Sequence, residues 1–161
     1  MNSRSEKSSA FLKQAEFDYQ FVAEIKNSLP LTPLCYRAAH CQQASEKAVK
    51  ALFLKAVGEI KPSHALKGFI QGILRAAESS PKLRGSISRL FSKEMKKFLF
   101  EMEQTAPSDK WTKRNTEYPF EKDKKWTAPA EKNVFQSYEV EVWERKVGVL
   151  IVGVKKLFRE I

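Results

Sequence analysis

The chain has 161 residues, of which 42% are hydrophobic and 30% are charged, and this length fits one domain with a sizeable core. Twenty-nine Lys and Arg against 19 Asp and Glu give a formal charge of +10. This excess favours polyanionic partners, although a solvated, mildly basic surface would account for it equally well. No apolar run reaches the ~18 residues that span a bilayer and no signal-peptide core follows the N-terminus, so a cytoplasmic protein without a membrane segment is expected.

The first helix is expected over residues 8–27, where apolar side chains recur every three or four residues. Pro30 and Pro33 end it, because a proline disfavours helix in the residue before it. The second helix is expected over residues 34–57, up to the break at Gly58. One of its faces carries small residues, which would let a neighbouring helix approach closely, and another carries polar ones: His40, Gln43, Lys47 and Lys50.

Cys35 and Cys41 fall in this second helix and point to different sides of it, so they are expected to be free, buried thiols of a reducing compartment. A third helix is expected over residues 64–78, after Pro62 and a candidate cap at Ser63. Two glycines in this helix each cost about 1 kcal/mol against alanine, which indicates marginal stability or a close contact: Gly68 and Gly72.

A fourth helix is expected over residues 86–104, where large apolar residues share one face. Residues 105–133 then show neither helical nor strand periodicity and are expected to form a long loop. Long loops are often functional or disordered, and three aromatic residues favour partial ordering by packing: Trp111, Tyr118 and Trp126.

The last helix is expected over residues 133–159, with an apolar seam that Ile151 and Phe158 widen. The β-branched run at 147–154 would also suit a buried strand, but the chain offers no obvious partner strand. These elements predict an all-α, up-and-down bundle of about five helices, with residues 1–161 forming one domain.

The segment His40–Ala51, read as His-Cys-Gln-Gln-Ala-Ser-Glu-Lys-Ala-Val-Lys-Ala, resembles the signature helix of HEPN domains, the nucleotide-binding helical domains of higher eukaryotes and prokaryotes. Two later segments are similar to other parts of the family pattern. They are Ser63-His64-Ala65-Leu66, with Ala65 in place of an acid, and Arg114 ahead of Tyr118-Pro119, with a longer spacer than expected. The resemblance implies a helical bundle that forms two-fold homodimers, and the wide apolar face of the last helix is compatible with this.

Catalytic members of that family are metal-independent ribonucleases. The resemblance therefore implies that a catalytic chain would carry an Arg followed, after four to six residues, by a His on the last long helix. There the His assists proton transfer at the ribose 2′-hydroxyl and the Arg offsets phosphate charge. The two histidines of this chain, His40 and His64, do not follow an Arg at that spacing, and the expected last helix contains no His. A protein without catalytic residues is therefore favoured, although enzyme activity stays uncertain.

No metal or cofactor is expected, because the two histidines lack companion carboxylates at ligand spacing and no phosphate-binding loop is present. The remaining candidate site is a cleft between the second helix and the 105–133 loop. Cations there would face phosphates and an aromatic ring would stack on a base. The alternative is that the aromatic residues only anchor the loop and that His40 only forms local hydrogen bonds. The candidate ligand-binding residues are His40, Gln43, Lys47, Lys50, Arg114 and Tyr118.

The sequence thus favours a non-catalytic HEPN-type module that binds a nucleotide or RNA, or that docks a nucleotidyltransferase partner in a toxin–antitoxin-like system. The alternative is a metal-independent ribonuclease toxin that uses His40 or His64.

Overall fold

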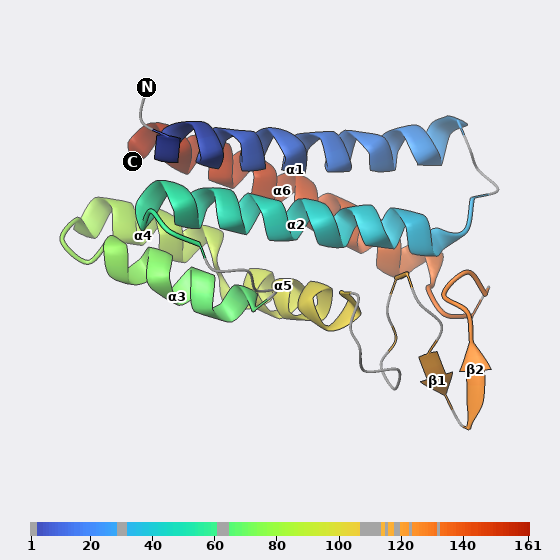
Figure 1. Ribbon diagram of the computed structural model, residues 1–161. Helices are drawn as coiled ribbons and strands as arrows, with labels where there is room; N and C mark the ends of the chain where they lie inside the picture. Colours follow the sequence, from blue (N-terminus) through green and yellow to red (C-terminus); the bar gives the residue numbers. More distant parts are fainter. Residues whose placement is uncertain are drawn as a thin grey trace.

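Three long helices run side by side: α1 (Ser3–Ser28), α2 (Leu34–Ala56) and α6 (Ser137–Glu160) (Figure 1). This arrangement comes from a computed structural model, which describes residues 3–28, 32–60, 65–106, 114, 116–117, 120–122, 124–131 and 133–161. Three shorter helices, α3 (Leu66–Ala76), α4 (Pro81–Leu90) and α5 (Lys93–Thr105), pack beneath α2 and α6 (Figure 1). The predicted all-α bundle is confirmed.

The small residues of α2 allow the close packing that the sequence predicts. Helix α2 contacts α1 along most of its length (Figure 1). Its fully buried small residues are Ala38, Cys41, Ala44, Ala48 and Ala51. Both cysteines are free and buried, and burial raises the pKa of each thiol. Among the described helices, none is long and apolar enough to cross a membrane.

The expected fourth helix is in fact two helices, so the described residues contain six helices. The helix is interrupted at Phe91 and Ser92. A new helix starts there, and the Ser92 hydroxyl caps it by accepting a hydrogen bond from the Met95 amide at 3.3 Å. Before it, Pro81 occupies the first turn of α4 and Ser80 caps it, so this helix begins five residues earlier than predicted. Continuous apolar spacing through Phe91 hides the break from a periodicity argument.

The expected long loop contains a short antiparallel hairpin. Strand β1 (Phe120–Lys122) pairs with β2 (Lys125–Thr127), and both project from one end of the bundle (Figure 1). Lys124 has a φ of 63°, the left-handed conformation that tight hairpin turns require. The prediction that this segment lacks strands was therefore wrong.

Helix α6 confirms the helical interpretation of residues 147–154 over the strand alternative. One detail of its apolar face differs from expectation. Ile151 is only 5% exposed and belongs to the core, whereas Val149 and Val152 are exposed. Within residues 147–157, the apolar side chains exposed on the outer surface of α6 are therefore these two valines.

Candidate functional site

His40 projects from α2 toward α1. Its ring lies edge-on to that of Phe21, with centroids 4.7 Å apart, and its Nδ1 atom is 3.7 Å from Oδ1 of Asp18. That separation is beyond a hydrogen bond, and Nδ1 is buried without a hydrogen-bond partner. The side chain as a whole remains 25% exposed, so His40 lies at the boundary between the α1–α2 interface and solvent.

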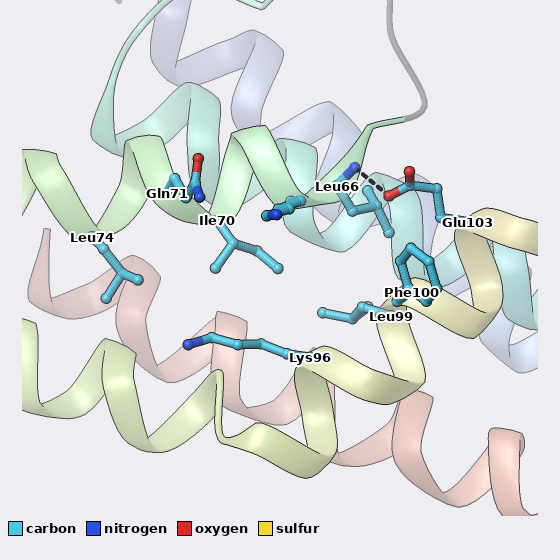
Figure 2. A pocket seen from close by; sticks show the side chains of 9 residues that line it. Leu66, Ile70, Gln71, Leu74, Lys96, Leu99, Phe100 and Glu103 are labelled. Carbon is cyan, nitrogen blue, oxygen red and sulfur yellow. Dashed lines mark hydrogen bonds between the residues drawn. The ribbon is translucent and has the colours of Figure 1, made fainter.

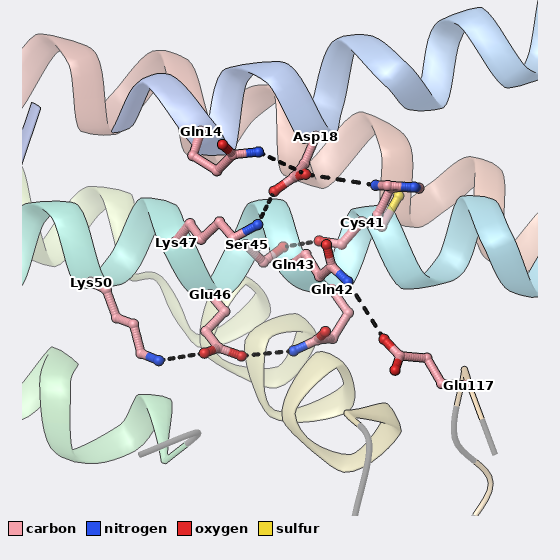
Figure 3. A network of polar contacts seen from close by, with 11 residues as sticks. Gln14, Asp18, Cys41, Gln42, Gln43, Ser45, Glu46, Lys47, Lys50 and Glu117 are labelled. Atoms are coloured by element: carbon pink, nitrogen blue, oxygen red, sulfur yellow. Dashed lines mark hydrogen bonds and ion pairs between the residues drawn. The ribbon is translucent and has the colours of Figure 1, made fainter. Parts of the chain in front are cut away.

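Lys47 lies about two turns beyond His40 on α2 and forms an ion pair with the same carboxylate, that of Asp18 (Figure 3). Its Nζ atom is 2.6 Å from Oδ2 of Asp18, and Gln14 donates to Oδ1 at 3.4 Å. Burial acts to raise the pKa of Asp18, but His40 and Lys47 together outweigh it, so this pKa lies below its usual value. The charge of Lys47 is therefore used inside the bundle.

Lys50 is also paired, in this case within its own helix. It forms an ion pair with Glu46, whose other carboxylate oxygen accepts a hydrogen bond from Gln42 at 2.9 Å (Figure 3). The Lys50 side chain is 12% exposed, and its amine lies 5.9 Å from the ring centroid of Phe69. Such a cation has little freedom to bind a phosphate.

A groove does lie between α2 and the segment that follows α5, as the sequence predicts. Its volume is about 460 Å³, and Gln43 donates across it to Glu117 at 3.5 Å. Two of the predicted ligand-binding residues line it. We call this the α2 groove, and it is formed by Cys35, Tyr36, Ala39, His40, Gln43, Thr116, Glu117, Ala128, Pro129 and Ala130.

Arg114 lies apart from the α2 groove and anchors the start of α6. Its guanidinium forms two hydrogen bonds with the Glu139 carboxylate, at 2.7 and 3.1 Å, and a third with the Val134 carbonyl at 3.0 Å. It also stacks over the Phe135 ring, with 4.8 Å to the centroid. These contacts hold Arg114 as a structural clamp. The other candidates of this region, Tyr118, Trp111 and His64, lie outside the described residues.

The structure thus divides the predicted cleft. It brings His40 and Gln43 together in one groove, pairs Lys47 with a carboxylate of α1 and Lys50 with one of α2, and places Arg114 at a different point. Ligand binding by this set stays a prediction. Among the described candidates, however, each Lys or Arg is already paired with a carboxylate.

Exposed cations gather instead on α4 and α5, which the site prediction missed. Residues 81–97 contain six Lys or Arg and one acidic residue. All six are exposed, and within the described part of the chain no carboxylate forms an ion pair with any of them: Lys82, Arg84, Arg89, Lys93, Lys96 and Lys97. The signal was present in the sequence as a local charge excess.

The exposed surface of α5 combines these charges with an aromatic ring. Lys93, Lys96, Lys97 and Phe100 stand at helical spacing on the side opposite the buried Phe98 and Met102. Phe100 is 57% exposed. We call these four residues the α5 basic face. Amines beside an exposed ring are the combination by which proteins hold the phosphates and bases of single-stranded nucleic acids.

Comparison with protein-family models matches residues 6–118 to the HEPN domain. No curated protein and no solved structure matches the chain. The matched range contains α1 from residue 6 onward and all of α2 to α5, and so includes both the α2 groove residues up to Glu117 and the α5 basic face.

Proposed function

The chain belongs to the HEPN domain family, and from this premise we propose that it is a non-catalytic RNA-binding module that uses the α5 basic face. The observation that carries the proposal is the contrast between two sets of cations. Those of the predicted cleft are neutralised by Asp18, Glu46 and Glu139, whereas those of α4 and α5 are exposed and have no ion-pair partner among the described residues. Free cations at helical spacing favour a polyanion, because neutralising phosphates releases their counterions.

A charge-matched pair of variants tests the proposal. Lys93→Gln/Lys97→Gln removes two positive charges from the α5 basic face, and Lys7→Gln/Lys156→Gln removes two from exposed positions on α1 and α6. Binding of a short single-stranded RNA would be measured by fluorescence anisotropy over a series of salt concentrations. Each phosphate contact on a single strand contributes about 0.7 to the slope of log affinity against log salt, so the α5 variant should lose about 1.4.

The control variant should keep both the wild-type affinity and the wild-type slope. Equal losses in the two variants would mean that only the net charge of +10 is at work and would contradict a site on α5. If the wild type binds no RNA at low salt, the docking of a nucleotidyltransferase partner, which the family resemblance implies, takes the place of this proposal.

A second candidate function, metal-independent ribonuclease activity, is favoured by the pair formed by His40 and Asp18. Asp18 lies 3.7 Å from Nδ1, which is longer than a hydrogen bond. Catalytic hydrogen bonds often shorten only when substrate binds, and a carboxylate that came within hydrogen-bond distance would orient the imidazole and leave the other nitrogen for proton transfer. Incubation of the protein with labelled RNA in EDTA tests this. Cleavage that disappears in His40→Ala would establish the activity, whereas cleavage no greater than that of the variant would exclude His40 as its source.

A further inference from the structure

A groove of about 310 Å³ opens between α3 and α5, beside the α5 basic face. Its floor is apolar: Leu66, Ile70 and Leu99 are at most 5% exposed. Figure 2 shows Ile70 and Leu99 facing one another, with Phe100 beside Leu66 at one end. We call this the α3–α5 groove. Its volume lies at the lower end of the range typical of small-ligand pockets, about 300–1,000 Å³.

The rim of the α3–α5 groove carries a cation on each side. Lys67 comes from α3 and Lys96 from α5, and both are exposed. At the Leu66 end the Glu103 carboxylate lines the groove, where its Oε2 atom accepts a hydrogen bond from the Leu66 amide at 3.0 Å (Figure 2). An apolar floor between two amines suits a ligand that is flat and apolar at one part and anionic at another.

Building on the proposed function, we propose that the α3–α5 groove receives a base of single-stranded RNA, which stacks on Phe100 while the neighbouring phosphates contact Lys96 and Lys67. Lys96 belongs to both the groove and the α5 basic face, so a strand bound along Lys93 and Lys97 passes the mouth of the groove. Phe100, which is 57% exposed, gains a partner for a ring surface that otherwise contacts water.

Two features favour this occupant over an acidic amphipathic helix of a partner protein. Glu103 would repel acidic side chains at the Leu66 end, whereas bases with an exocyclic amino group can donate to a carboxylate. In addition, the exposed cations continue beyond the groove to Lys93 and Lys97, which matches a repeated phosphate backbone. A duplex is disfavoured because its bases are already stacked and paired.

The test compares Phe100→Ala with Phe17→Ala, a control that truncates a similarly exposed ring (51%) on α1. Each protein would be titrated with a short single-stranded RNA and with the duplex of the same sequence. Phe100→Ala should weaken single-strand binding at least about fivefold, the lower end for loss of one stacked base, and should leave duplex binding unchanged. Phe17→Ala should bind both as the wild type does.

Phe100→Trp provides an independent readout and a conservative rescue. It should keep wild-type affinity, and the indole emission that it adds to that of the three native tryptophans should be quenched when single-stranded RNA binds, because the base stacks on it. Wild-type single-strand affinity in Phe100→Ala, or unquenched indole emission with RNA bound, would overturn the base site and leave the groove to a protein segment. Such a result leaves the proposed function standing if Lys93→Gln/Lys97→Gln still weakens binding, and removes both if it does not.

Discussion

The Nζ atom of Lys47 lies 2.6 Å from Oδ2 of Asp18, and this ion pair joins α2 to α1. Asp18 is only 6% exposed, so its charge depends on the few groups around it. Because a buried carboxylate without a partner is costly, Lys47 is required to hold Asp18 in the bundle. This need explains why one of the most prominent lysines of the family signature helix is unavailable to a ligand.

Asp18→Asn should destabilise the fold at neutral pH, by about 1.5–3 kcal/mol, the usual range for hydrogen bonds to a charged group. The pKa of Asp18 is lowered in the folded state, so its contribution is complete above the usual value of 3.8 and is lost as the pH falls through the lowered one. The difference in unfolding free energy between wild type and Asp18→Asn should therefore shrink below about pH 4. Urea denaturation at several pH values measures it.

Glu24→Gln is the control for that series, since Glu24 is an exposed carboxylate on the same helix. It should change stability little at any pH. A difference between wild type and Asp18→Asn that persists unchanged at the lowest pH would contradict the assigned charge pairing.

Arg114→Lys should reduce stability without changing RNA affinity. Lysine cannot reproduce the paired hydrogen bonds to Glu139 or the stacking on Phe135. Because the Arg114 side chain is 37% exposed, solvent weakens these charge-assisted bonds, and the free energy of unfolding should fall by about 1–2 kcal/mol. Arg159→Lys, at an exposed position near the end of α6, is the matched control. A specific loss of RNA affinity in Arg114→Lys would instead return Arg114 to the binding site that the sequence predicted.

The two glycines of α3 should respond in opposite directions to alanine. At Gly72 a Cβ atom would lie 2.5 Å from Cε2 of Phe53, whereas at Gly68 nothing lies within 4 Å. Gly72→Ala should therefore cost about 1–3 kcal/mol through overpacking, and Gly68→Ala should gain up to about 1 kcal/mol from helix propensity. Thermal unfolding of both variants decides this; equal effects would show that Phe53 moves aside without cost.

A homodimer, which the family resemblance leads us to expect, would use the outer surface of α6. Val149 and Val152 are 62% and 68% exposed there, and a two-fold interface on this surface would remove both apolar side chains from water. Sedimentation should give a mass near twice 18.5 kDa, and Val152→Asp should yield folded monomer, while Ser88→Asp, on the exposed side of α4, should not. A wild type that sediments as a monomer would remove the expectation.

The helices could be predicted from local sequence patterns. The candidate site could not, because two of its ion pairs join residues that are far apart in the sequence. The Glu46–Lys50 pair is visible in the sequence because four residues on a helix bring two side chains together. The Asp18–Lys47 pair is not, because only the packing of α1 on α2 joins residues 29 positions apart. The split between α4 and α5 had a signal in Ser80-Pro81 and Ser92, both of which precede helix starts, but the unbroken apolar spacing around Phe91 concealed it.

RNA that binds at α5 and the adjoining α3–α5 groove should perturb the backbone of both helices. Backbone amide NMR spectra of the isotopically labelled protein, titrated with a short single-stranded RNA, test it most directly. The largest shift changes should fall at residues 66–74 and 93–103, with little change around His40, Gln43 and Arg114. Changes concentrated at residues 36–50 and 114–139 would place the ligand in the cleft predicted from the sequence and would contradict the assignment to α5.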